Sequence, residues 1–239
     1  MKKISIVTAC YNEEENVEAL YKAVKIIMSK SLAHYKYEHL FIDNSSEDNT
    51  VEILKTLAKK DKKIKIIVNS RNFGHIRSPI YALMQADGDA VISLVADFQD
   101  PPELIPQLVA KWEAGNETVL AIKKSSKENK LLYKLRCCYY NLLSNLSETK
   151  IFKNFTGFGL YDRKIMDALK KMNDPYPFFR GMIAEIGYGV ASIEYDQPER
   201  KKGVTKNHFY GLYDMAILGI ISNSKVPLRM AIFVGFLSS

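Results

Sequence analysis

Apolar and polar residues follow two different periodicities along the first half of the chain. Short apolar runs rich in β-branched residues predict strands, and they lie at 4–9, 39–43, 64–68, 90–96 and 119–122. Between them, apolar residues recur at helical spacing and predict helices, which cover about 17–28, 51–58, 80–88 and 101–112. This alternation is typical of an α/β fold, with a mostly parallel central sheet and helices on both faces.

The pattern changes after residue 123. A polar linker (123–130), a long amphipathic helix (131–146), a strand (155–161) and a helix (163–172) are predicted next. An aromatic-rich loop (174–181), a basic loop (195–207) and an apolar helix (209–221) follow. Near the end, residues 230–237 form a further apolar run.

Polar side chains follow each of the first four predicted strands. The four polar segments are 11–13, 43–46, 69–74 and 97–100. In a parallel sheet, ligands bind beyond the carboxyl ends of the strands. We therefore expect these four loops to converge on one binding site.

Composition limits the class of protein without identifying it. The 239 residues are 47% hydrophobic and 26% charged, which is ordinary for a globular protein and excludes a disordered chain. The net charge of +7 favours anionic partners. Nucleic acid is a weak candidate because no recognition motif for it occurs.

The termini and cysteines add expectations about location. The N-terminal apolar run is short and ends in acids, so we expect no signal peptide. No stretch approaches the roughly 20 apolar residues of a membrane span. Three cysteines, two of them adjacent, form neither a disulfide framework nor a zinc motif, which favours a reducing compartment.

Two common phosphate-binding loops do not occur in the sequence. The loop after the first strand, Ala9–Glu13, lacks the GxGxxG of dinucleotide-binding enzymes, and there is no Walker A sequence. What the chain has instead is Asp43 at the end of the second strand and an acidic cluster after the fourth.

Several motifs taken together resemble those of family-2 inverting glycosyltransferases, which have the GT-A nucleotide-sugar fold. They are VTACYNEEENV, DNSSEDNT, RNFG, VADFQDPPELIPQLVAKWEAG, FTGFGLYDRKIMDAL, DPYPFFRG and ERKKGVTKNHFYGLYDMAILGIISNSKVPLR. The resemblance covers residues 3 to about 230. It is to the branch that contains dolichyl-phosphate mannose synthase and bacterial polyprenyl-phosphate glycosyltransferases.

The resemblance implies a division of the chain into three parts. Residues 1–123 would be the nucleotide-sugar-binding α/β half, and 124–208 the acceptor-side half of the same catalytic domain. Residues 209–239 would be a membrane-proximal helix and the start of a truncated transmembrane segment, with Arg229 at its cytoplasmic end.

The resemblance also implies a donor pocket, lined by Ala9, Tyr11, Glu13 and Asp43 and shaped by Arg71. Glu13 and Asp43 have the oxygen acceptors to bind a base and a ribose. An alternative for Asp43 is a turn cap, because Asx turns are common at such positions. An alternative for Arg71 is a surface side chain on a glycine-containing loop.

Asp97 and Gln99 are the predicted ligands for Mg2+ or Mn2+. In an extended segment, residues two apart point the same way, and hard cations prefer oxygen ligands. Relatives usually carry an acid where this chain has Val95. The predicted site therefore lacks one carboxylate. Asp100 is either part of this acidic cluster or the N-cap of the following helix.

On the acceptor side, Arg180, Arg200 and Lys206 would contact the donor diphosphate or an acceptor phosphate, as the resemblance implies. Arginine suits bidentate phosphate contact, although charged loops are often simply solvated. Glu185 would be the catalytic base if the acceptor were a sugar hydroxyl. A lipid phosphate is already anionic and needs positioning by positive groups, not a base. For Glu185 the alternative is a structural ion pair.

The sequence thus predicts an inverting glycosyltransferase with Asp97, Arg180 and Glu185 as catalytic candidates. It would move a sugar from a UDP- or GDP-sugar to a polyprenyl phosphate at the cytoplasmic face of the membrane, as a peripheral or C-terminally anchored protein and possible homo-oligomer. One alternative is transfer to a glycan hydroxyl, with Glu185 as base. Another is a nucleotide-sugar-binding protein without turnover, suggested by Val95.

Overall fold

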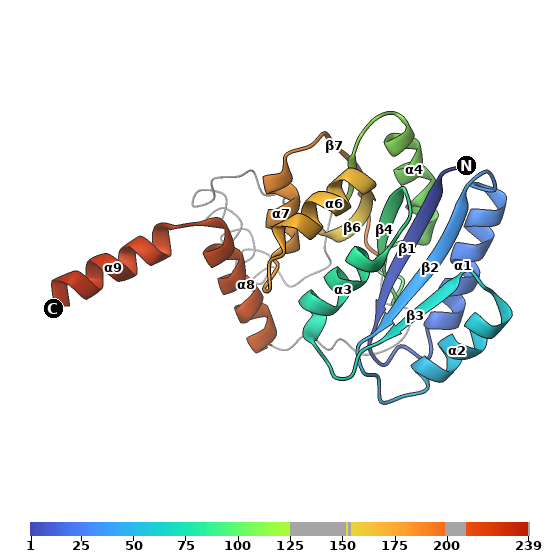
Figure 1. Ribbon diagram of the computed structural model, residues 1–239, viewed down its shortest axis with the longest axis horizontal. Coiled ribbons are helices and arrows are strands. Elements are labelled where there is room, and N and C mark those ends of the chain that lie inside the picture. The colour runs from blue at the N-terminus through green and yellow to red at the C-terminus, as the bar shows by residue number, and fades with distance from the viewer. Residues whose placement is uncertain (125–151, 153, 199–208, 239) are drawn as a thin grey trace.

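The computed structural model describes residues 1–124, 152, 154–198 and 209–238 (Figure 1). These residues form a seven-stranded sheet in the order β3-β2-β1-β4-β6-β5-β7. Its strands are β1 (Lys3–Cys10), β2 (Lys36–Asp43), β3 (Ile64–Val68), β4 (Ala90–Val95), β5 (Thr118–Lys123), β6 (Phe155–Asp162) and β7 (Val190–Tyr195). Every neighbouring pair is parallel except those of β6, which runs antiparallel to β4 and β5. The predicted α/β fold with a mostly parallel sheet is confirmed.

One face of the sheet is covered by α1 (Val17–Lys30), α2 (Thr50–Lys60) and α4 (Ile105–Glu113), the last preceded by a short 3-10 helix (Pro102–Leu104). Apolar positions of α1 at helical spacing, such as Leu20 and Val24, pack against the sheet. The sequence pattern therefore identified both the helices and the sides that they bury.

The opposite face is covered by α3 (Gly74–Gln85), α6 (Arg163–Met172) and α7 (Phe179–Ile186). Helix α6 begins where the Asp162 carboxylate accepts a hydrogen bond from the Lys164 backbone N–H at 2.9 Å. It ends at Asn173, which has a left-handed backbone.

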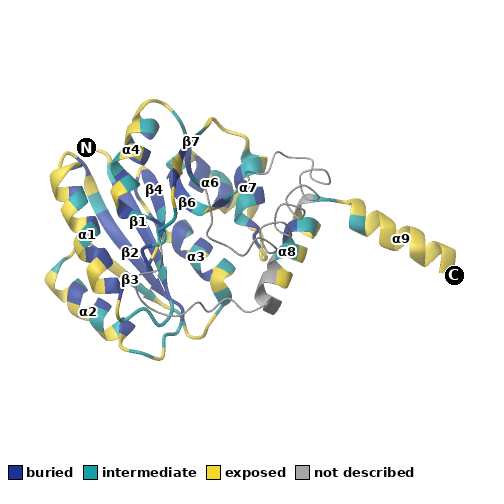
Figure 2. Ribbon diagram, turned by 180° about the vertical axis from the view of Figure 1, so that it is seen from behind, coloured by how far each residue is buried: buried dark blue, intermediate teal, exposed yellow. Residues whose placement is uncertain are grey.

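Two C-terminal helices lie outside these layers. Helix α8 (Phe209–Asn223) packs beside α7, and α9 (Val226–Ser238) projects away from the sheet with no buried residue (Figures 1 and 2). Within the described part of the chain, no single helix is long and apolar enough to cross a bilayer. Only the bent pair Ala216–Ser222 and Val226–Ser238, which meet at 85°, reaches that length and composition together.

Some predicted elements differ from the observed ones. Strand β7 was not predicted, and it includes Tyr195, which we had placed in a loop. Helix α7 begins at Phe179, inside the predicted aromatic loop. The predicted helix 131–146 lies outside the described residues. The division of the chain at residues 123 and 208 stays a prediction.

His39 in β2 is a buried polar residue on the face of the sheet that α1 and α2 cover. Its side chain is 1% exposed, and its Nε2 lies 3.1 Å from the Thr8 hydroxyl. Its ring stacks on Phe41 with centroids 3.9 Å apart, and its Nδ1 has no hydrogen-bond partner among the described residues. Burial lowers the pKa of His39 to about 3. The folded protein therefore keeps this imidazole neutral.

We predict that His39 makes the fold sensitive to acid. Between pH 6.5 and 4 the unfolded chain binds a proton at His39 that the folded chain excludes, so the free energy of unfolding falls as the pH falls. The loss from this group is about 3 kcal/mol over that range. His39→Gln should lack this part of the loss in urea unfolding measured at pH 7 and pH 4. An equal loss in the variant and the wild type would contradict the prediction.

Candidate active site

The ends of three neighbouring strands create the site. In the sheet, β1 lies between β2 and β4 and is parallel to both. The register pairs Cys10 with Asp43 and Ala9 with Val95, so the three strands end at the same level. The loops that follow them therefore meet at one edge of the sheet, as the sequence predicted.

Hydrogen bonds hold the loop after β1 against the loop after β2. The Asn12 backbone N–H donates to the Ser46 hydroxyl at 2.8 Å, and the Glu13 N–H donates to the Thr50 hydroxyl at 2.8 Å. In return, the Glu47 N–H donates to the Asn12 side-chain oxygen at 2.8 Å. Asn12 itself has a left-handed backbone, with φ of 53°, which asparagine tolerates better than most residues. The predicted binding residues Ala9 and Tyr11 lie half-buried at this junction.

The two predicted acids of this corner are partly occupied by local hydrogen bonds. Asp43 is fully buried, and its carboxylate accepts from both the backbone N–H and the hydroxyl of Ser46. Asp43 therefore caps this turn, and its predicted role in binding the nucleoside of the donor stays a prediction. Glu13 accepts from the Asn16 side-chain amide at 2.7 Å. Burial, followed by the nearby Glu13 and Asp43 carboxylates, raises the pKa of the Cys10 thiol.

Asn44 connects the loop after β2 to the loop after β3. Its side-chain oxygen accepts from the Asn69 side-chain amide at 3.0 Å and from the Phe73 backbone N–H at 2.9 Å. Arg71, in the same β3 loop, is exposed, and its guanidinium lies 4.1 Å from the centroid of the Phe73 ring. Asn44 was not among the predicted site residues. Its position directly after Asp43, at the end of a strand, could have indicated a role in the site.

The turn after β4 corrects one prediction. Phe98 has a left-handed backbone with φ of 62°, and the Gln99 backbone N–H donates to the Asp97 carboxylate at 3.0 Å. This segment is a turn, so the prediction that Asp97 and Gln99 point the same way from an extended strand is wrong. The reason is that the Asp97 carboxylate accepts from the N–H two residues later, as in an Asx turn. Asp97 is 6% exposed, whereas Val95 is 40% exposed.

Asp100 belongs to the acidic cluster and does not cap the following helix. The 3-10 helix there has Pro101 as its cap residue, without a side-chain cap. The Asp100 carboxylate is 4% exposed and accepts a hydrogen bond from the Tyr195 hydroxyl at 3.0 Å. Burial raises the pKa of Asp100 to about 6, against the opposing effects of the Lys123 ammonium and the Tyr195 hydrogen bond.

Lys123 and Tyr195 were not predicted as site residues. They are the last residues of β5 and β7, and the register pairs them directly. Because β6 runs antiparallel to both β4 and β5, β5 and β7 have the same direction as β4. Their carboxyl ends therefore reach the same edge. Applying the strand-end rule to the fifth predicted strand would have found Lys123, whereas Tyr195 required β7 to be recognised.

The predicted acceptor-side residues are only partly brought together. Arg180 lies half-buried in the first turn of α7, next to Phe179, whose ring centroid is 5.2 Å from that of Tyr161. Glu185 is exposed, and its five-residue separation from Arg180 places the two side chains about 140° apart around the helix. Arg200 and Lys206 lie outside the described residues.

The residues at the β4 turn offer few ligands of their own for a metal ion. In the described ranges 1–124, 152, 154–198 and 209–238, no three His, Cys, Asp or Glu side chains come together as a metal site. Asp97 and Gln99 supply one carboxylate and one amide oxygen. This donor set fits a hard cation such as Mg2+ that is bound by one or two protein ligands, with substrate phosphates and water completing its coordination.

The arrangement of these elements defines the class of protein. A mostly parallel sheet with one antiparallel strand between β4 and β5, and an acidic turn after β4, is that of a GT-A glycosyltransferase. A family model described as Glycosyl transferase family 2 matches residues 5–170. The chain belongs to this family and is an enzyme that transfers a sugar, which confirms the predictions of family, fold and enzyme class.

Known proteins support this assignment at two levels. The bactoprenol glucosyl transferase of Shigella phage SfV is 35% identical over 98% of this chain and 76% of its own length. The glycosyltransferase YkcC of Bacillus subtilis, described as uncharacterized, is 35% identical over 98% of this chain and 72% of its own. The Mycobacterium tuberculosis glucosyl-3-phosphoglycerate synthase, in complex with Mn2+, UDP-glucose and glycerol 3-phosphate, shares the fold with a TM-score of 0.57, at 17% identity over 90% of this chain and 76% of that one.

We predict that the Asp100 carboxylate destabilises the folded protein at neutral pH. Its pKa is about 6 when folded and about 3.9 when unfolded, so the folded state binds more protons between these values. The free energy of unfolding then falls as the pH rises from 4 to 7, by up to about 3 kcal/mol from this group. Asp100→Asn keeps an oxygen acceptor for Tyr195 but has no proton to lose.

Thermal unfolding of both proteins at several pH values tests this prediction. The stability of Asp100→Asn relative to wild type should increase steadily from pH 4 to pH 7. Asp167→Asn, at an exposed position of α6, measures in parallel the effect of removing a surface carboxyl. A constant difference between Asp100→Asn and wild type over this range would rule out the raised pKa.

Proposed function

We propose that this glycosyltransferase moves a sugar from a UDP- or GDP-sugar to a polyprenyl phosphate, with inversion at the anomeric carbon. The observation that carries the proposal is the charge arrangement on the acceptor side of the Asp97 turn. Lys123 provides positive charge beside Asp100, and Arg180 lies half-buried in the first turn of α7, while Glu185 is exposed and turned away from Arg180 around that helix. Such a site suits an acceptor that arrives as an anion and needs no base. The 35% identity to a bactoprenol glucosyl transferase supports the same acceptor.

In this proposal the strand-end loops bind the donor. Ala9, Tyr11, Glu13 and Asp43 line the nucleoside pocket, and Arg71 lies at its side. The acceptor phosphate oxygen attacks the anomeric carbon, and the bond from that carbon to the diphosphate breaks with its electron pair leaving on the nucleoside diphosphate. No proton has to be removed from the attacking phosphate. Arg180, with Arg200 and Lys206 as implied by the resemblance, balances the phosphate charges.

A divalent cation belongs to the same proposal. Asp97 would hold Mg2+ or Mn2+, with the donor diphosphate and water as its other ligands. Gln99 stays a predicted ligand, although the turn removes the shared direction on which its pairing with Asp97 was based. When bound, the ion would neutralise the charge that develops on the leaving diphosphate. The fold neighbour with bound Mn2+ and UDP-glucose supports this part.

We place the reaction at the cytoplasmic face of a membrane. The support is the exposed apolar surface of α9, where Leu228, Phe233 and Phe236 are 63–80% exposed. Apolar side chains left in water on this scale are typical of an interaction surface. A polyprenyl acceptor would itself reside in the bilayer.

Transfer of a radiolabelled sugar tests the acceptor. With wild-type protein, a divalent cation and a polyprenyl phosphate, label should enter the organic phase. Glu185→Gln should transfer at the wild-type rate because no base is needed, whereas Arg180→Ala should lose about 100-fold or more in rate by removing a charge-stabilising group. Label that stays in a water-soluble saccharide, and disappears with Glu185→Gln, would show instead that the acceptor is a hydroxyl group.

Val95→Asp tests the account of the metal. The added carboxylate should lower the Mg2+ or Mn2+ concentration needed for half-maximal activity by about tenfold, which corresponds to about 1.4 kcal/mol. Val95→Asn, which has a similar shape without the charge, is the matched control. If the aspartate and asparagine variants require the same metal concentration as wild type, the β4 turn does not hold the ion.

A further inference from the structure

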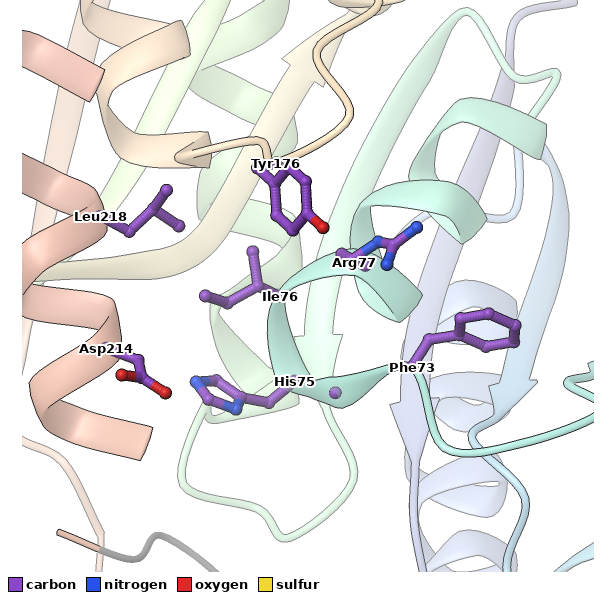
Figure 3. Close-up of a pocket in the computed structure, with 8 residues that line it drawn as sticks. Phe73, His75, Ile76, Arg77, Tyr176, Asp214 and Leu218 are labelled. Atoms are coloured by element: carbon purple, nitrogen blue, oxygen red, sulfur yellow. The ribbon is translucent and has the colours of Figure 1, made fainter. Parts of the chain in front are cut away.

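A cavity of about 350 Å3 lies between α3, the loop before α7, and α8 (Figure 3). Its walls come from the first turn of α3, from Tyr176 and from two residues of α8, Asp214 and Leu218. In Figure 3, Ile76 points into the space between Leu218 and Tyr176. His75 and Asp214 face each other at another side of the cavity. The volume is in the range of small-ligand sites. Ile76, Leu218 and Tyr176 give the cavity apolar and aromatic surface.

Positive charge lies at one side of this cavity. The Arg77 guanidinium is 5.5 Å from the centroid of the Tyr176 ring and 5.9 Å from that of Phe73. Two aromatic faces therefore hold it at the rim. Burial, followed by the nearby Arg180 guanidinium, lowers the pKa of His75, so Arg180 is close enough to act electrostatically on the cavity. Arg77 favours an anionic group on the side away from Asp214.

Helix α7 connects the neighbourhood of the cavity to the centre of the sheet. The positive charge of Arg180 helps to lower the pKa of His75. Arg180 comes directly after Phe179 in α7. The Phe179 ring packs edge-on against Tyr161. Burial, followed by Asp100, raises the pKa of Tyr161, which places this ring near the acidic turn. Arg180 is therefore close to the cavity and next in the chain to a ring that packs on β6.

The surface beyond the cavity is apolar. Leu218 belongs to α8, which also exposes Ile217 and Ile221 and leads to the exposed α9. A ligand with an apolar chain would find such surface in continuity with the cavity wall. The cavity is too small for a long chain and has room only for the end of one.

We propose that this cavity binds the phosphate-bearing end of the polyprenyl-phosphate acceptor. Ile76, Leu218 and Tyr176 contact the first isoprene units, and Arg77 and Arg180 attract the phosphate. Asp214 repels the phosphate and so fixes which way the acceptor enters. This inference rests on the proposed function, since it assigns the place where that acceptor binds.

Two variants test the assignment by different physical means. Ile76→Trp fills the cavity, and Arg77→Ala removes a charge at its rim. Each should raise the KM for a ten-carbon isoprenyl phosphate by about tenfold or more, the effect of losing about 1.4 kcal/mol of binding. The KM for the nucleotide sugar and the value of kcat should stay within about twofold of wild type, since donor contacts are unchanged.

Matched controls carry the same chemical changes elsewhere. Gln85→Trp adds the same ring at an exposed position in the last turn of α3, and Lys171→Ala removes a charge from an exposed position in the last turn of α6. Both should keep the wild-type KM for the isoprenyl phosphate. Stabilisation of each variant by the free nucleoside diphosphate, measured as a shift in Tm, verifies that the donor half is folded.

The outcomes separate this inference from the proposed function. If wild-type protein transfers sugar to the isoprenyl phosphate and both cavity variants behave like their controls, the cavity assignment is wrong and the proposed function stands. If wild-type protein transfers to no polyprenyl phosphate, both are wrong. If the cavity variants raise the KM for a water-soluble saccharide acceptor instead, the cavity binds a sugar and the lipid assignment is overturned.

Discussion

The parallel pairing of β1 with β2 and β4 is the constraint on which the site depends. The hydrogen-bonded ladder sets Cys10 opposite Asp43 and Ala9 opposite Val95, so three loops leave the sheet together. A shift of register by one residue would turn every side chain of a strand to the other face. Apolar layers on both faces resist that shift, because helices bury Ile6 on one side and Val7 on the other. The core thus fixes the position of the polar groups at this edge of the sheet.

Several carboxylates at these strand ends are buried, and the hydrogen-bond donors around each one determine how it tolerates burial. Asp43 accepts two hydrogen bonds from Ser46, and Asp97 accepts one from the Gln99 backbone. For Asp100, the Tyr195 hydrogen bond and the nearby Lys123 only partly offset burial, and its pKa rises to about 6. Lys123 and Tyr195 come from β5 and β7, so the protonation of the acidic turn depends on strands from both halves of the chain. A buried network of this kind is costly unless its members satisfy one another.

The sequence predicted what periodicity encodes and missed what depends on single backbone angles or on tertiary pairing. Six strands, most of their helices and the shared edge followed from the hydrophobic pattern. Strand β7 was missed because only Ile193 and Tyr195 in it are buried, so its alternation is short. The Asp97 turn was missed because phenylalanine rarely adopts the left-handed backbone of Phe98. The Asp100–Tyr195 hydrogen bond joins residues 95 positions apart, which no local pattern indicates.

Val95 changes the balance of charge at the acidic turn in a way that bears on how the donor would bind. With an apolar side chain 40% exposed there, the turn carries one negative charge fewer toward an incoming diphosphate than an acid would give. Fewer protein ligands weaken a hard-cation site, but a less acidic edge also repels the diphosphate less. In the proposed enzyme the cation would therefore be held mainly by the donor, and the two would bind as a pair. The protein would then contribute Asp97, Gln99 and the positive charges of Lys123 and Arg180, leaving the diphosphate to complete the metal site.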